Sequence, residues 1–217
     1  MVRPEKRDKD HYFSETPSGP HQIRTITVQV GERRFYFQTD RSVFSRGGLD
    51  RGSRLLIERM EIPPKGNVLD WGCGYGPIGL IAAALNPHAH IWMVDINERA
   101  VALARQNALL NHISNVTILK SDGISALPSD LKVETVVSNP PIRAGKKVLA
   151  KLIEEAHQCL TVGGSLWLVA PTWLGARSLQ KMMQEVFGNA ECVDRKGGYR
   201  VLRSVKSADK LADDPTG

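Results

Sequence analysis

The sequence lacks the segments that would place the chain in a membrane or carry it out of the cell. In its 217 residues no apolar run approaches the roughly 18 residues of a membrane-spanning helix. The first 20 residues, MVRPEKRDKDHYFSETPSGP, are charged and contain no apolar core of the kind found in secretory signals. We therefore expect a cytoplasmic protein.

Cysteine is also scarce. Cys73, Cys159 and Cys192 are odd in number and widely spaced, which indicates neither a disulfide framework nor a zinc site. No metal is expected on this basis, and the simplest role for Cys73 is that of a small packing residue.

Acidic residues are outnumbered by basic ones, 23 against 29, which gives a formal net charge of +6. A basic surface favours anionic partners, nucleic acid first, although a solubilising charge is an equally simple explanation. Residues 207–217 are acidic in contrast, and we expect a disordered tail there. The charge alone leaves the partner open.

The order of apolar and polar residues divides the rest of the chain. Residues 1–20 are predicted to form a flexible arm, and 21–62 a β-hairpin turning at Gly31-Glu32-Arg33, followed by a Gly-rich turn and a short helix. From 63 to 206 strands and helices alternate, with strands at 67–71, 90–95, 115–120, 134–139 and 165–170 and helices at 77–85, 97–111, 146–160 and 175–187. A turn is expected at Gly163-Gly164, before the fifth of these strands.

This alternation predicts an α/β fold with a Rossmann-like, doubly wound and mostly parallel sheet of seven strands. The last two strands are separated only by Arg195-Lys196-Gly197-Gly198, so they are expected to form an antiparallel C-terminal hairpin. In such sheets a ligand binds beyond the carboxyl ends of the strands. The residues that follow each strand are therefore the candidates for a site.

The first of these strands ends in Asp70-Trp71-Gly72-Cys73-Gly74-Tyr75-Gly76-Pro77, whose alternate glycines let the backbone approach a ligand closely. The stretch from Gly74 also fits the G-x-G-x-x-G dinucleotide fingerprint, a weak signal by itself. Pro77 removes an N–H that a pyrophosphate would need, and Asp70 would repel it while suiting an amino group. Both points favour S-adenosylmethionine over NAD.

The next two strands each end in an aspartate. Asp95, followed by Ile96, is placed to accept hydrogen bonds from two ribose hydroxyls, or alternatively to cap a helix together with Asn97. Asp122, followed by Gly123, is placed to accept a bond from an adenine amino group, or alternatively is a solvated loop residue.

The fourth strand ends in Asn139-Pro140-Pro141-Ile142. Methyl transfer to an exocyclic amine of a base requires two acceptors aimed at its two N–H bonds, so that the nitrogen lone pair points at the methyl group. The Asn139 side-chain oxygen and the Pro140 carbonyl meet this requirement, and the rigid prolines preorganise them without offering a competing N–H. The alternative is a proline turn that merely ends a strand.

With the Gly-rich stretch after Asp70, the strand ending in Asp95 and Asn139-Pro140-Pro141, the sequence resembles the class I S-adenosylmethionine-dependent methyltransferases. It resembles more narrowly the small-domain family typified by ribosomal small-subunit RNA guanine-N2 methyltransferases. The residues that carry the narrower resemblance are Val43-Phe44-Ser45 with Leu49-Asp50-Arg51-Gly52-Ser53-Arg54-Leu55-Leu56, and Ser138-Asn139-Pro140-Pro141-Ile142-Arg143-Ala144-Gly145.

The resemblance implies methylation of a guanine N2 amine in ribosomal RNA or a small-subunit particle, with the segment that holds Phe44 closing over the cofactor. The chain departs from the family in having no room for a second, non-catalytic domain. It also carries Ile142 where many exocyclic-amine methyltransferases have an aromatic residue that stacks on the base. Arg143, a planar cation, is a candidate to stack instead.

Basic residues near Asn139 are candidates for binding RNA: Arg143, Lys146 and Lys147 beside the proline loop, and Arg195, Lys196, Arg200 and Arg203 in the last hairpin. A solvated face explains each cluster equally simply. Other activities stay open as well: transfer to adenine N6 or to a protein glutamine amide, an NAD-linked oxidoreductase, and a non-catalytic RNA-binding relative.

Overall fold

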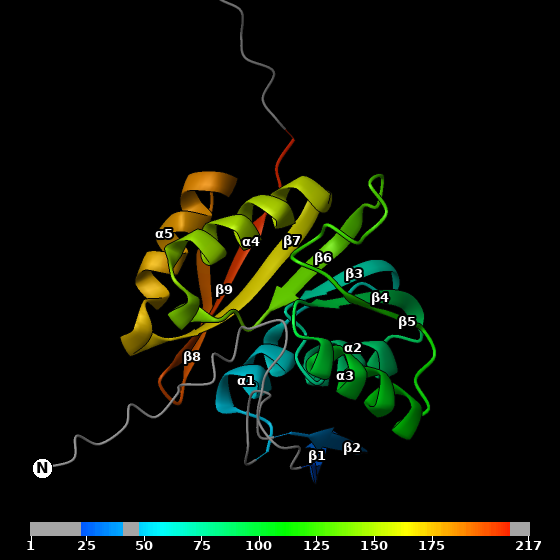
Figure 1. Cartoon of the computed structure of the whole chain (residues 1–217). Coiled ribbons are helices and arrows are strands. Elements are labelled where there is room, and N and C mark those ends of the chain that lie inside the picture. The colour runs from blue at the N-terminus through cyan, green and yellow to red at the C-terminus, as the bar shows by residue number, and fades with distance from the viewer. Residues whose placement is uncertain (1–22, 41–47, 209–217) are drawn as a thin grey trace, which may run out of the picture.

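The computed structural model describes residues 23–40 and 48–208. The predicted arm at 1–20, Phe44 and nearly all of the predicted tail lie outside the described residues. Figure 1 shows one central sheet with a layer of helices on each face. No helix of the described part is long and apolar enough to cross a membrane.

The central sheet has seven strands in the order β5-β4-β3-β6-β7-β9-β8. The five strands from β3 to β7 run parallel, and β9 and β8 complete the sheet in antiparallel pairing. This arrangement confirms the predicted fold class. The strands are β3 (Lys65–Trp71), β4 (His88–Asp95), β5 (Val116–Lys120), β6 (Val133–Ser138), β7 (Leu160–Pro171), β8 (Glu191–Lys196) and β9 (Tyr199–Val205).

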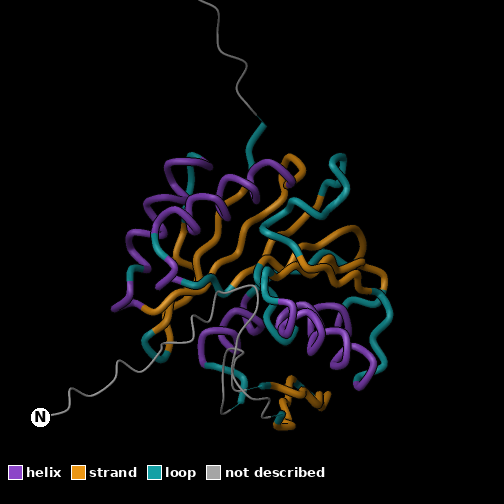
Figure 2. Tube along the Cα trace, in the orientation of Figure 1, coloured by secondary structure: helices purple, strands orange, loops and turns teal. Residues whose placement is uncertain are grey.

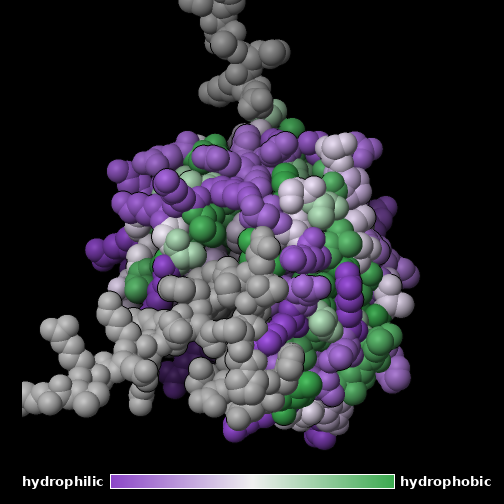
Figure 3. All heavy atoms as spheres, viewed as in Figure 1, coloured by the Kyte–Doolittle hydropathy of each residue, from purple (hydrophilic) through white to green (hydrophobic). Residues whose placement is uncertain are grey.

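Two apolar cores hold the layers together. One lies between the sheet and helices α1, α2 and α3, and the other between the sheet and helices α4 and α5 (Figure 1). Hydrophilic side chains cover the outer surface of α4 and α5 (Figure 3), as expected for helices that bury one stripe only. The helices are α1 (Arg51–Arg59), α2 (Pro77–Leu85), α3 (Glu98–Leu110), α4 (Lys146–Cys159) and α5 (Ala176–Phe187).

The N-terminal hairpin consists of β1 (Arg24–Val30) and β2 (Arg33–Thr39), which pair antiparallel. It lies outside the helix layer rather than in the main sheet (Figure 2). Asn107 of α3 and Asn111, the residue that caps the end of this helix, bind the hairpin through its backbone. Asn107 exchanges hydrogen bonds with the backbone of Gln38, and Asn111 does the same with the backbone of Tyr36.

The turn that the sequence predicts at Gly163-Gly164 is instead an irregularity within β7. The register with β6 moves from Val133–Leu160 to Thr135–Ser165, so the intervening residues of β7 bulge out. Gly163 has φ +82°, and the bulge is held because the Gly163 N–H donates to the Lys206 carbonyl at 2.8 Å. The glycines are therefore needed for a bulge. A bulge and a turn both interrupt the apolar residues of a strand with glycine, so the sequence alone does not distinguish them.

Candidate functional site

The three glycines that follow β3 have different tasks. Gly72, Gly74 and Gly76 all have positive φ, which favours glycine at each position. A Cβ added at Gly72 or Gly74 would meet no atom of the described residues within 4 Å, whereas one at Gly76 would lie 2.9 Å from the Leu80 side chain. The first two glycines therefore leave open space for a ligand, and the third allows α2 to pack closely.

Cys73, between the first two glycines, is buried in the core, which agrees with a packing role. Gly72 and Cys73 both donate their N–H groups to the carbonyl of Val94 at 2.9 Å. The loop after β3 is in this way fixed to the end of β4, where Asp95 follows.

The Asp95 carboxylate sits beside the Gly-rich loop. Its Oδ2 accepts a hydrogen bond from the Gly74 N–H and its Oδ1 one from the Asn97 N–H, both at 2.8 Å. Burial raises the pKa of Asp95, against the lowering effect of these backbone donors. Each oxygen keeps a second lone pair for a further donor. The cap of α3 is Asn97, which accepts bonds from Arg99 and Ala100, so the helix does not need Asp95 as a cap. Ile96 lies between them and is partly exposed.

Asp70 is fully buried beneath the first turns of α2. Its Oδ2 accepts the Gly79 N–H at 2.8 Å, and no described residue donates to its Oδ1. The pKa of Asp70 is raised to about 7, mainly by burial; the hydrogen bond from Gly79 opposes the shift, and the neighbouring charge of Asp95 adds to it. Asp70 therefore does not lie on an open surface, although one of its oxygens still lacks a partner.

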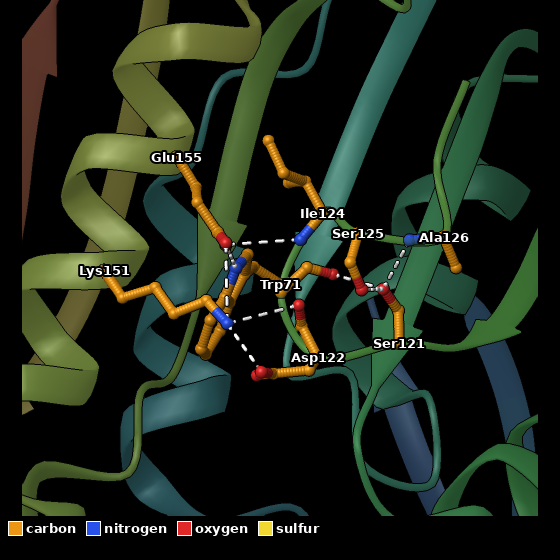
Figure 4. A network of polar contacts seen from close by, with 9 residues as sticks. Trp71, Ser121, Asp122, Ile124, Ser125, Ala126, Lys151 and Glu155 are labelled. Atoms are coloured by element: carbon orange, nitrogen blue, oxygen red, sulfur yellow. Dashed lines mark hydrogen bonds and ion pairs between the residues drawn. The ribbon is translucent and has the colours of Figure 1, made fainter. Parts of the chain in front are cut away.

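The loop after β5 is fixed by a polar network that reaches from α4 (Figure 4). Glu155 accepts hydrogen bonds from the Trp71 indole at 2.8 Å and from the Ile124 N–H at 3.2 Å. A Cβ at Gly123 would collide with the Glu155 carboxylate, and φ there is +66°, so both space and backbone require glycine. Asp122 forms an ion pair with Lys151 at 2.8 Å and its side chain is 67% exposed. The sequence did not indicate Glu155.

Asn139, at the end of β6, is held by two residues from the start of α1. Its Nδ2 donates to Asp50 Oδ1 at 3.2 Å and to Ser53 Oγ at 3.0 Å. Because a carboxylate only accepts hydrogen bonds, these contacts determine which end of the amide is the nitrogen. No described residue donates to the Asn139 Oδ1, so the acceptor end of the amide is left for another molecule.

The two prolines form a tight turn directly after Asn139. Pro141 has φ −73° and ψ 79°, and the Ile142 N–H donates to the Pro140 carbonyl at 2.8 Å, which is an inverse γ-turn. Neither proline offers a competing N–H, but the residue that follows them does, because the Ile142 N–H occupies one side of the Pro140 carbonyl. The carbonyl keeps one lone pair for a further donor.

Two contacts of the site could not be predicted from local sequence motifs. Asp50 and Ser53 belong to the stretch that resembles the small-domain family, yet nothing local indicates that they hold Asn139. Asn107 is fully buried and donates to the Tyr75 carbonyl at 2.8 Å, which ties the Gly-rich loop to the N-terminal hairpin. Asparagine inside a helix is the signal that was available, because it is a poor helix former.

The basic residues fall into two groups. Arg143, Lys146 and Lys147 are exposed, and within the described part of the chain none of them forms an ion pair. The last hairpin contributes fewer free cations than the sequence suggests. Arg200 is buried, and Arg203 pairs with Glu61 and Glu191. Lys196 is exposed but pairs with Glu58 at 4.0 Å, so among these four Arg195 alone is exposed without an ion pair in the described part of the chain.

Comparison with known proteins agrees with this geometry. The model of the family described as methyltransferase small domain matches residues 34–203, so the chain belongs to that family. YbxB of Bacillus subtilis (strain 168), described as an uncharacterized protein, is 41% identical over 198 residues, 91% of this chain and 98% of YbxB. Ribosomal RNA small subunit methyltransferase C of Pseudomonas syringae is 36% identical over 76% of this chain.

Among solved structures, an N2 methyltransferase of 16S rRNA from T. thermophilus (RsmC), in complex with AdoMet and guanosine, superposes with a TM-score of 0.77 at 26% identity. That match covers 89% of this chain and 53% of the RsmC chain. The chain thus spans about half the length of the named ribosomal RNA methyltransferases that it matches.

The cofactor follows from these findings. Family membership and the AdoMet in the T. thermophilus structure confirm S-adenosylmethionine as the methyl donor. The residues present also fit it: the open space at Gly72 and Gly74 accommodates a ligand, and the lone pairs of Asp95 suit a ribose diol.

Proposed function

We propose that the chain transfers a methyl group from S-adenosylmethionine to the exocyclic N2 amine of a guanine in ribosomal RNA. The observation that carries the proposal is the orientation of Asn139. Its amide nitrogen is occupied by Asp50 and Ser53, so its oxygen is available to an N–H donor at the end of β6. Guanine N2 and ribosomal RNA are proposed as the acceptor and the substrate because the similar proteins include ribosomal RNA methyltransferases, one of them an N2 methyltransferase of 16S rRNA.

The cofactor lies along the carboxyl ends of β3, β4 and β5 in this proposal. The methionine end occupies the open space over Gly72 and Gly74, and Asp95 accepts bonds from the ribose hydroxyls. The adenine lies beside Asp122 and Gly123, in the loop that Glu155 holds against α4. When bound, the cofactor supplies a methyl group on a positively charged sulfur, which is already an activated leaving group.

Asn139 and Pro140 position the acceptor nitrogen. That nitrogen is conjugated with the base, and it becomes nucleophilic only when its lone pair turns toward the methyl group. The Asn139 oxygen and the remaining lone pair of the Pro140 carbonyl accept its two N–H bonds and hold it in this orientation. Because the γ-turn at Pro141 and the contacts of Asp50 fix both acceptors beforehand, little reorganisation accompanies the reaction.

RNA binding is assigned to the exposed cations beside this turn, Arg143, Lys146 and Lys147. They follow the catalytic loop directly in the chain, so phosphates that they neutralise flank the base that enters the site. Their contribution to affinity is expected to fall as the salt concentration rises, because binding releases counterions from the RNA.

The same acceptor pair would serve an adenine N6 amine or a protein glutamine amide, so the substrate needs a direct test. Purified protein is incubated with radiolabelled S-adenosylmethionine and with deproteinised ribosomal RNA, small subunits and ribosomal protein, all from a strain that lacks the gene. Nuclease digestion and mass analysis identify the modified nucleoside. N2-methylguanosine that is absent with Asn139→Ala supports the proposal. Label found only in N6-methyladenosine or only in protein overturns it.

A further inference from the structure

Trp173 is an exposed tryptophan in a structure that buries or partly buries the other three. It lies in a short 3-10 turn, Thr172–Leu174, directly after β7, and 69% of it is exposed. Trp71 and Trp167 are only 7% and 1% exposed, and Trp92 is partly buried. A single exposed apolar side chain is common on protein surfaces, so the exposure of this ring matters only together with its orientation and its neighbours.

The Trp173 ring is held in place by the last hairpin. Its centroid lies 5.7 Å from that of Tyr199, in an edge-to-face arrangement with an angle of 71°. A Cβ at Gly198 would lie 2.6 Å from the indole, and the Gly198 carbonyl accepts the Thr172 N–H at 2.8 Å. Tyr199 packs in turn on Gly52 of α1, where a Cβ would lie 2.9 Å from its ring. The ring is therefore exposed but already oriented.

The segment that carries the ring lies at the same edge of the sheet as the proposed catalytic turn. Trp173 and Asn139 both follow neighbouring parallel strands at the same edge of the sheet, because β6 pairs with β7. Ile142 Cγ2 lies 3.8 Å from the place where a Cβ of Gly175 would be, two residues after Trp173. Ile142 is the residue at which an aromatic ring would stack on a target base, and an aliphatic side chain stands there.

We propose that Trp173, supported by Tyr199, is a stacking platform for an unpaired base of the RNA substrate. This inference rests on the proposed function, since it assumes an RNA substrate at this edge. An aromatic face binds bases of any sequence, and the exposed cations Arg143, Lys146 and Lys147 on the adjoining turn and helix supply phosphate contacts. These cations favour RNA over an apolar protein partner as the occupant of the ring.

The first test uses tryptophan fluorescence, because Trp173 is the most exposed of the four tryptophans. Titration with a short oligouridylate and with deproteinised 16S rRNA is expected to quench the emission of the wild-type protein. The quenching should disappear in Trp173→Phe, which removes the reporter while keeping an aromatic ring. Quenching that persists unchanged in Trp173→Phe would contradict the inference.

The second test separates stacking from charge by measuring affinity for labelled 16S rRNA at several salt concentrations. Trp173→Leu should weaken binding roughly 5- to 150-fold, while Trp173→Phe should stay within about threefold of the wild type. The slope of affinity against salt should not change in either variant, whereas Lys146→Ala with Lys147→Ala should lower it by about one per lost phosphate contact. Leu109→Ala, at a similarly exposed apolar position on α3, is the matched control.

The outcomes distinguish this inference from the proposed function. Methyl transfer to RNA with an unchanged KM in Trp173→Leu overturns the platform and leaves the function intact. Methylation of protein alone, whatever the RNA affinity of Trp173→Leu, overturns the proposed substrate and with it a platform for substrate RNA. Self-association of the wild type that is lost in Trp173→Leu, without any loss of RNA affinity, would show that Trp173 is a contact between copies and overturn the platform.

Discussion

Asn139 donates its side-chain amide to Asp50, with a distance of 3.2 Å between Nδ2 and Oδ1. The same Asp50 oxygen accepts the Ser53 N–H at 3.0 Å and so caps α1. The residue that begins a helix before the Gly-rich loop is thus also the residue that orients the amide after β6. A single carboxylate couples the fold of α1 to the proposed chemistry.

The first prediction concerns the amide itself. Asn139→Ala should lower kcat on the order of 10²–10³, by analogy with the loss of one preorganised donor from an oxyanion hole. Binding of S-adenosylhomocysteine should be nearly unchanged, because the acceptor acts mainly in the transition state. Asn139→Asp should also be slow, since its charge would stabilise the positively charged sulfur before transfer. Steady-state kinetics and calorimetry measure the two quantities, and a near-normal kcat in Asn139→Ala would reduce the Asn-Pro-Pro sequence to a strand-ending turn.

The second prediction concerns the two residues that hold the amide. Ser53→Ala removes one contact to Asn139 but keeps the backbone N–H that Asp50 caps, so kcat should fall about fivefold, as for a lost hydrogen bond of roughly 1 kcal/mol, with little change in Tm. Asp50→Ala should lower kcat and also destabilise the fold by about 1 kcal/mol through the lost cap.

Asp50→Asn is the matched control, because one amide oxygen can accept both the Ser53 N–H and the Asn139 amide as the carboxylate oxygen does. It should retain most of the activity and of the stability. If Ser53→Ala turns over at the wild-type rate, the hydrogen bonds seen here do not position Asn139 for catalysis.

The third prediction places the cofactor on Asp95. Asp95→Ala should weaken binding of S-adenosylhomocysteine by one to two orders of magnitude, since hydrogen bonds to a charged acceptor contribute about 1.5–3 kcal/mol. Isothermal calorimetry at fixed pH measures this directly. Asp130→Ala, an exposed loop position, is the control. Unchanged affinity in Asp95→Ala would rule out this placement of the ribose.

Much of the architecture was predictable because its signals are local. Alternating strands and amphipathic helices indicate a parallel sheet directly, and the short Arg195–Gly198 link indicates the antiparallel end. The bulge at Gly163 was not predictable, because glycines mark bulges and turns alike. The docking of the hairpin onto Asn107 was not predictable either, since it joins residues 69 positions apart.

The site divides in the same way. The backbone conformation of the site can be predicted from residue type, as with Gly72 and Gly74, which leave open space beside the backbone. The residues that contact each other in the site are distant in the chain: Asp50 lies 89 residues before Asn139, and Asp122 lies 29 residues before Lys151. A sequence motif predicts which residues lie at the carboxyl ends of the strands. Only the folded structure shows which of these residues form hydrogen bonds or ion pairs with each other.

The last prediction follows from Asp70, whose pKa burial raises from its usual 3.8 to about 7. Between these two pH values the unfolded chain has lost a proton that the folded chain keeps, so the folded state loses stability as the pH rises. Above about pH 7 the penalty is complete and amounts to about 4 kcal/mol, at 1.36 kcal/mol for each unit of pKa. The penalty is absent below the unfolded pKa.

Asp70→Asn removes this ionisation, and its amide oxygen can still accept the Gly79 N–H. The variant should therefore gain stability relative to the wild type as the pH rises from about 4 to about 8, and the gain should level off above pH 7, where Asp70 is ionised in both states. Urea unfolding of both proteins without cofactor, at a series of pH values, measures the difference. Asp130→Asn controls for the loss of one carboxylate from an exposed loop. If the stabilities of the wild type and Asp70→Asn run parallel across this range, Asp70 ionises in the folded protein as easily as in the unfolded chain, and its burial has no proton-linked cost.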